Sequence, residues 1–311
     1  MKNKTILITL LVFVLITIGC VFAYFHFTGE SENEVVVQNE KQALFTLENY
    51  PKVDASLATQ PLTDAFAAAF TGENNISESW YDYTNTHPAY LRLIDKEVDV
   101  IVVTEPSADE LQYAKDKGVE LEVTPVVREG FVFYVNSNNP VNNLSLSQIK
   151  KIYSGKTVNW NEVGGNAGVI RPFQRPANSG SQTGMLSLVM KDTKLMTPLK
   201  ENLVETMESI INLVADYDNG ENAIGYSYYY YATTIFETID EEISNKIKLL
   251  AVDGVKPTNE TIKNGEYTLN TAYYIVTRKG DTSADAQKLV NAMLSEEGQK
   301  VAEEAGYVGV K

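Results

Sequence analysis

Cysteine and histidine are the scarcest chemically reactive residues of this sequence. Cysteine occurs once, at Cys20, and histidine occurs twice, at His26 and His87. A single cysteine forms no internal disulfide, and no His/Cys/Asp/Glu spacing typical of a metal site is present. We therefore expect a fold without disulfides, metal or any other cofactor.

Positive charge is also scarce. The chain has 26 basic and 41 acidic residues, and its formal net charge is −15. Nucleic acids are bound largely through their phosphates by clustered Lys and Arg, so this balance argues against a nucleic-acid partner. It does not argue against a small anion, because directed hydrogen bonds and local dipoles can hold one while distant carboxylates are screened.

The long apolar run at the N-terminus, residues 5–27, follows Lys2 and Lys4. This pattern is typical of a secretory signal or a membrane span. The residues before Cys20, Ile-Gly, resemble the end of a bacterial lipobox, although Thr17 replaces its usual leucine and the apolar run continues past Cys20. We expect residues 1–28 to anchor the chain, by lipidated Cys20 or as an uncleaved helix, and residues 29–42 to form a polar tether. Either anchor places the body on the extracytoplasmic face of the membrane.

The body alternates between strand-like and helix-like segments, which predicts an α/β fold with mostly parallel sheets flanked by helices. Its length suits two lobes. We predict that residues 43–136 and about 251–311 form lobe I, that about 137–250 form lobe II, and that a ligand cleft lies between them. Strands are expected at residues 98–103, 119–127, 131–135, 168–173, 223–226, 246–252 and 272–277, and helices at 62–70, 90–95, 108–117, 146–153, 284–294 and 298–305.

The most informative motif is the segment from Gln174 to Met185, which joins a predicted strand to a predicted helix. Ser179 and Ser181 can donate hydroxyl protons, Gly180 allows close approach of the backbone, and Arg175 offers a fork of N–H donors. These groups predict an oxyanion site. An ordinary helix cap is the alternative, since serine begins many helices that bind nothing.

Two further junctions have the same character. Ser56 and Thr59 precede the predicted helix 62–70, and Thr104 follows the predicted strand 98–103. Open α/β sheets bind ligands outside the carboxyl ends of their strands. Three such loops with hydroxyl groups therefore predict convergence on one small ligand.

The body resembles the phosphate-binding proteins of ABC transporters, of the type II periplasmic-binding superfamily. The similarity extends from about residue 53 to 310, and its most specific part is the string from Leu144 to Gly165. It also includes residues 131–136, 139–141, 223–226 and 295–299. The resemblance implies a monomeric solute-binding protein rather than an enzyme. Such a protein captures an oxyanion, above all inorganic phosphate, by hinge closure and delivers it to the permease and ATPase subunits of an importer.

Ligand residues follow from this resemblance position by position. They are Thr59 and the backbone of Gln60 in the first loop, Thr86 in a second loop that lacks the usual glycines, Thr104 and Glu105 in the third, and Arg175, Ser179, Gly180 and Ser181 in the fourth. A carboxylate at Glu105 would accept the O–H of phosphate and disfavour sulfate. Alternatively, Glu105 begins a helix or pairs with Arg175.

Two other functions remain open. A membrane-tethered sensor or surface protein could keep this fold without coupling to transport, as the altered second loop suggests. A hydrolase could use Ser179 or Ser181 as nucleophile, but His87 is the one histidine of the body that could serve as its base. The tyrosines of residues 226–231 are expected to pack near the cleft, with closure of the cleft as the alternative.

Overall fold

The computed structural model describes residues 43–73, 83–216 and 220–311. The predicted anchor 1–28, the tether 29–42 and therefore Cys20 lie outside these residues. Within the described ranges, no helix is both long enough and apolar enough to span a membrane.

Within the described residues, ten strands form one eight-stranded sheet and one two-stranded sheet. The order along the large sheet is β1-β2-β9-β3-β6-β5, and β10 and β7 also pair with β3. The strands are β1 (Val53–Ala55), β2 (Val100–Val103), β3 (Leu121–Asn136), β4 (Asn143–Leu144), β5 (Arg171–Pro172), β6 (Ala223–Tyr228), β7 (Ile247–Leu249), β8 (Ala251–Val252), β9 (Asn270–Arg278) and β10 (Val308–Gly309).

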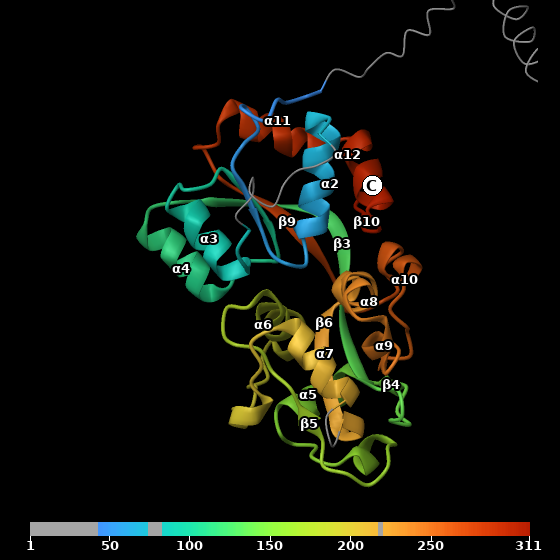
Figure 1. The fold of residues 1–311 in the computed structure, drawn as a ribbon. Helices are drawn as coiled ribbons and strands as arrows, with labels where there is room; N and C mark the ends of the chain where they lie inside the picture. Colours follow the sequence, from blue (N-terminus) through green and yellow to red (C-terminus); the bar gives the residue numbers. More distant parts are fainter. Residues whose placement is uncertain (1–42, 74–82, 217–219) are drawn as a thin grey trace, which may run out of the picture. The chain divides into compact units, whose positions relative to one another are not determined.

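Helices fill most of the connections (Figure 1). The α-helices are α2 (Gln60–Thr71), α3 (Thr86–Ile94), α4 (Ala108–Asp116), α5 (Leu146–Tyr153), α6 (Gly180–Gly184), α7 (Met207–Asp216), α8 (Phe236–Ile239), α9 (Glu241–Ser244), α10 (Asn259–Lys263), α11 (Ala284–Met293) and α12 (Glu296–Glu304). Two π-helical segments, η2 (Met185–Met190) and η5 (Tyr231–Ile235), and three short 3₁₀ segments, η1 (Trp160–Val163), η3 (Lys200–Asn202) and η4 (Gly220–Asn222), complete the described elements.

The expectation of mostly parallel sheets is wrong. Among the described strands, β1–β2, β4–β8 and β5–β6 pair in parallel, whereas β2–β9, β3–β9, β3–β6, β3–β7 and β3–β10 are antiparallel. The alternation of strands and helices correctly placed α4 between β2 and β3. It could not show that the distant β9 inserts between these two strands, which replaces a parallel contact by two antiparallel ones.

Strand β3 is continuous where the sequence predicted two strands. Its residues 121–130 pair with β9, and from Phe131 onward it pairs with β6. Gly130 does not interrupt the strand, because its backbone remains in register with Asn270. In Figure 1, β3 runs from the region of α2 and α12 towards that of β4. One strand thereby belongs to two parts of the sheet, and Glu129 and Gly130 lie where its partner changes.

Local sequence signals explain the helix starts that matter for the site. In α2, Pro61 occupies the first turn, where its missing N–H is no loss. In α4, Ser107 and Glu110 form a capping box. Helix α2 then packs its apolar face, including Leu62 and Phe66, into the main core beside β1. This packing fixes the loop between β1 and α2.

Candidate functional site

Four segments of the chain, Thr104 and two tyrosines surround a cavity of about 300 Å³. The segments contribute residues 56–58, 85–88, 175–181 and 205–208, and Thr104, Tyr228 and Tyr231 complete the lining. Seven of the ten predicted ligand residues are brought together here: Ser56, Thr86, Thr104, Arg175, Ser179, Gly180 and Ser181. A larger hollow of about 480 Å³ borders α10 and α12, but no predicted ligand residue lines it.

Thr59 and Gln60 are not among the lining residues, because both serve the fold. Thr59 is fully buried, and its hydroxyl donates to the Val102 carbonyl and accepts the Ser56 N–H at 3.1 Å. The N–H of Gln60 donates to the Ser56 carbonyl at 2.9 Å. The lining of this loop begins at Ser56, three residues before Thr59, and continues with Leu57 and Ala58.

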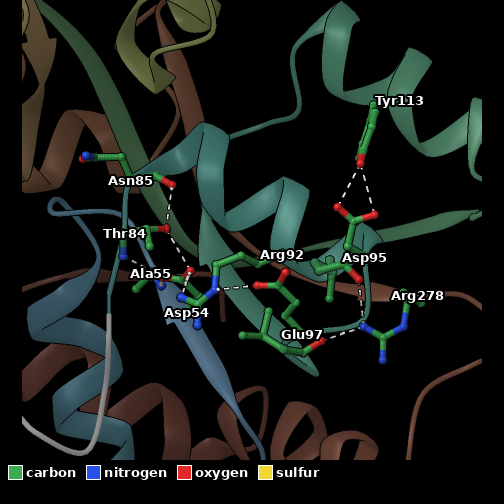
Figure 2. A network of polar contacts seen from close by, with 11 residues as sticks. Asp54, Ala55, Thr84, Asn85, Arg92, Asp95, Glu97, Tyr113 and Arg278 are labelled. Atoms are coloured by element: carbon green, nitrogen blue, oxygen red, sulfur yellow. Dashed lines mark hydrogen bonds and ion pairs between the residues drawn. The ribbon is translucent and has the colours of Figure 1, made fainter.

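Thr86 reaches the cavity because a buried carboxylate holds the preceding loop (Figure 2). Asp54 is fully buried, and its carboxylate accepts the N–H and the hydroxyl of Thr84, each at 2.8 Å. Arg92, from the last turn of α3, donates to the same carboxylate at 2.7 Å. The start of α3 is thus tied to β1. Sequence reasoning missed Asp54, although an acidic residue in the short apolar strand before Ser56 was a usable signal.

Thr104 and Gly180 meet across the cavity. A Cβ atom on Gly180 would lie 2.5 Å from the Thr104 hydroxyl and 2.8 Å from that of Thr86, so only glycine allows this approach. Thr104 is 2 % exposed, and its hydroxyl has no hydrogen-bond partner among the described residues. The nearby Tyr228 hydroxyl donates instead to the Gly180 carbonyl at 2.9 Å.

Arg175 is the one Lys or Arg residue among those that line the cavity. Its Nη2 donates to the Glu205 carbonyl at 2.7 Å, and its Nη1 donates to the Ser181 hydroxyl at 3.3 Å. Burial lowers the pKa of Arg175, but a guanidinium keeps its proton in proteins. Its Nε is buried without a partner among the described residues.

Glu105 does not line the cavity, and this corrects its predicted role. Thr104 and Glu105 follow β2 directly, and successive side chains of an extended segment point in opposite directions. Thr104 faces the cavity, and Glu105 instead accepts a hydrogen bond from Ser187 of η2. No ion pair between Glu105 and Arg175 occurs among the described residues. The predicted rejection of sulfate by Glu105 therefore has no geometric support.

His87 lines the cavity, and a carboxylate holds its ring. Its Nδ1 lies 2.9 Å from Oε1 of Glu110, a fully buried side chain whose pKa is raised by burial. The Ser179 hydroxyl accepts the Gln182 N–H at 3.3 Å, as a helix cap. His87 and Ser179, which the suggested hydrolase would use as base and nucleophile, thus each have a structural hydrogen-bond partner.

The remaining lining residues were not predicted individually. The loop before α7 contributes Glu205 and Thr206, and the first turn of α7 contributes Met207 and Glu208. No motif marks this loop, because it meets the 175–181 loop only through the tertiary fold. The tyrosine cluster was a partial signal for this site, because Tyr228 and Tyr231 line the cavity. Tyr226 does not line it; its hydroxyl accepts the backbone N–H of Arg175 at 3.0 Å.

The chain is similar to known proteins over most of its length. The family model described as the PBP superfamily domain matches residues 49–297. The phosphate-binding protein PstS of Bacillus subtilis is 28 % identical, over 99 % of this chain and 95 % of its own length. PstS of Borreliella burgdorferi is 23 % identical, over 85 % and 91 % respectively.

Solved structures show the same fold. An ABC-type phosphate transport receptor from Vibrio cholerae superposes with a TM-score of 0.60 at 20 % identity, covering 83 % of this chain and 98 % of the receptor. PstS from Borrelia burgdorferi gives a TM-score of 0.52 at 21 % identity, covering 83 % and 98 % respectively. The predicted type II periplasmic-binding fold is thereby confirmed. The chain belongs to the PBP superfamily domain family.

Proposed function

We propose that this protein captures phosphate outside the cytoplasm and delivers it to an ABC importer. The observation that carries the proposal is a cavity at which the guanidinium of Arg175 meets several hydroxyl groups, among them those of Thr86 and Ser181. A phosphate ion offers acceptors for donors of this kind. The similarity to the phosphate-binding protein PstS of two bacteria supports the same ligand.

The proposed transport cycle has two lobes that close on the ligand, with the boundaries predicted from the sequence. Closure would exclude water and strengthen each charge-assisted hydrogen bond to the anion. The protein would act as a monomer, held at the membrane by lipidated Cys20 or by an uncleaved helix, and would dock on permease and ATPase subunits. Fatty-acid labelling of the wild type and of Cys20→Ala distinguishes the two anchors, because only lipidation is lost in the variant.

Isothermal calorimetry tests the ligand directly. We expect phosphate to bind at micromolar concentration or below, an order-of-magnitude estimate typical of several charge-assisted hydrogen bonds in an enclosed site. Sulfate and molybdate serve as comparison anions. Absence of phosphate binding even at millimolar concentration would exclude the proposed function.

Replacing Arg175 with alanine should weaken phosphate binding by about tenfold to more than a hundredfold. A charge-assisted hydrogen bond contributes roughly 1.5–3 kcal/mol, and about 1.4 kcal/mol is a factor of ten. Arg175→Lys should recover only part, because an ammonium lacks the planar fork of donors. Arg128→Ala is the matched control, since it removes the same charge from an exposed site that does not line the cavity.

The melting temperature of the ligand-free protein separates binding from folding for Arg175. The side chain makes two hydrogen bonds to the protein, so we expect Arg175→Ala to lower that temperature only modestly. A large loss of stability with unchanged affinity would mean that Arg175 supports the fold and not the ligand.

A further inference from the structure

One side of the cavity, the segment 56–58, is held by a residue from the far end of the chain. Ala58 lines the cavity, and its backbone carbonyl accepts a hydrogen bond from the Tyr307 hydroxyl at 3.0 Å. Tyr307 follows α12, which packs beside α2 (Figure 1). The side chain of Tyr307 is buried, and the residue does not line the cavity. Tyr307 therefore contacts the segment 56–58 from behind.

The Tyr307 ring is fixed by another side of the same cavity. It stacks on the Tyr230 ring, with centroids 3.7 Å apart and an angle of 21° between the planes. Tyr230 belongs to the segment 228–231, whose first and last residues line the cavity. The Tyr230 hydroxyl donates to the Ala305 carbonyl at 2.7 Å and so holds its ring against the segment that carries Tyr307. Tyr307 thus joins the segments 56–58 and 228–231.

The hydrogen bond from Tyr307 fixes one peptide group of the turn that precedes α2. The peptide between Ala58 and Thr59 is planar and trans, so its carbonyl and its N–H point in opposite directions. The carbonyl accepts from Tyr307, and the N–H donates to the Ser56 carbonyl at 2.9 Å. Loss of the Tyr307 hydroxyl would release one end of this peptide, and the turn that brings Ser56 to the cavity would be less firmly held.

We propose that Tyr307 is a positioning residue of the phosphate site and acts through the Ala58 carbonyl. This inference rests on the proposed function. Because Tyr307 does not line the cavity, its hydroxyl influences the ligand only through the segment 56–58. Without the hydroxyl, this segment would have more freedom in the ligand-free protein, and phosphate would have to order it on binding. Such ordering reduces affinity, whereas a segment that is already held adds no such cost.

Tyr307→Phe tests this role, because it removes the hydroxyl and keeps the ring. We expect the phosphate affinity of the whole protein, measured by calorimetry, to fall by about three- to tenfold, the equilibrium equivalent of one neutral hydrogen bond. Tyr267→Phe is the matched control, since the buried Tyr267 donates to the Phe131 carbonyl, also at 3.0 Å. Neither Tyr267 nor Phe131 lines the cavity, so the control should keep the affinity of the wild type.

Melting temperatures and amide hydrogen exchange separate positioning from folding. Both variants lose one buried hydrogen bond, so their melting temperatures should fall to a similar extent. Exchange of the segment 56–58 in the ligand-free protein should become faster in Tyr307→Phe alone. A folded Tyr307→Phe with the affinity and the exchange of the wild type would overturn the inference and leave the proposed function intact. Absence of phosphate binding by the wild type would instead remove the proposed function, and with it the phosphate site that Tyr307 is proposed to position.

Discussion

Replacing Asp54 with alanine should lower the free energy of unfolding by about 3–5 kcal/mol, the usual cost of removing one partner of a buried ion pair. The side chain of Asp54 is fully buried, whereas that of Arg92 is 26 % exposed. The Asp54 carboxylate also accepts both donors of Thr84. In the variant, the N–H and the hydroxyl of Thr84 lose their acceptor, and the Arg92 guanidinium loses its buried counter-charge.

The same substitution should weaken phosphate binding, although Asp54 does not line the cavity. Its bonds to Thr84 position the start of α3 (Figure 2). There the Thr86 hydroxyl lies beside Gly180. Asp54 is thus a positioning residue. Asp54→Asn should recover little, because the amide presents N–H donors towards the donors already there.

Chemical denaturation and calorimetry measure the two effects. Asp95→Ala is the matched control, because Asp95 forms an exposed ion pair with Lys117 at 2.7 Å, close to the same helix. Exposed pairs of this kind contribute little to stability. Equal loss of stability in the two variants would contradict the role assigned to the buried carboxylate.

The sequence predicted those parts of the fold and site that depend on neighbouring residues. The buried run that forms β2 correctly placed Thr104 at its end, and Pro61 correctly placed α2. The small residues of the 175–181 loop likewise identified a segment that approaches Thr104 closely. Each inference needed only the periodicity or conformational preference of a short segment.

The errors arose where a distant segment decides the outcome. Thr59 donates to a carbonyl of β2, and Glu105 accepts from Ser187. Neither partner is close in sequence. The hydroxyl of Thr59 and the carboxylate of Glu105 were therefore predicted to bind a ligand. Long-range contacts also insert β9 between β2 and β3. They likewise bring Glu205 to Arg175.

Glu129 gives the second large expected effect: Glu129→Gln should stabilise the protein at pH 8 and change its stability little at pH 4. Glu129 is 2 % exposed and lies where β3 changes partner from β9 to β6. Its carboxylate accepts the N–H groups of Gly130 at 2.8 Å and Tyr230 at 3.3 Å. No Lys or Arg forms an ion pair with it among the described residues. Burial therefore raises the pKa of Glu129 to about 7.

The direction of the pH effect follows from this raised pKa. Below the ordinary value of 4.5, Glu129 is protonated in the folded and the unfolded chain, so folding carries no penalty for its charge. As the pH rises from there to about 7, the unfolded chain ionises first and stability is lost. Above about 7 the loss is complete, on the order of 3 kcal/mol at roughly 1.4 kcal/mol for each pH unit between the two values.

Glutamine removes this penalty and keeps the acceptor. Its Oε1 can still accept from Gly130 and Tyr230, so Glu129→Gln should stabilise the protein above pH 7 by up to about 3 kcal/mol. Denaturant unfolding at pH 5, 6, 7 and 8 measures the difference, and Glu122→Gln, an exposed site on the same strand, is the control. A difference between wild type and Glu129→Gln that does not grow with pH would mean that the buried carboxylate ionises at no cost. Its charge would then be stabilised by the Gly130 and Tyr230 N–H groups, and β3 would change partners around a permanent negative charge.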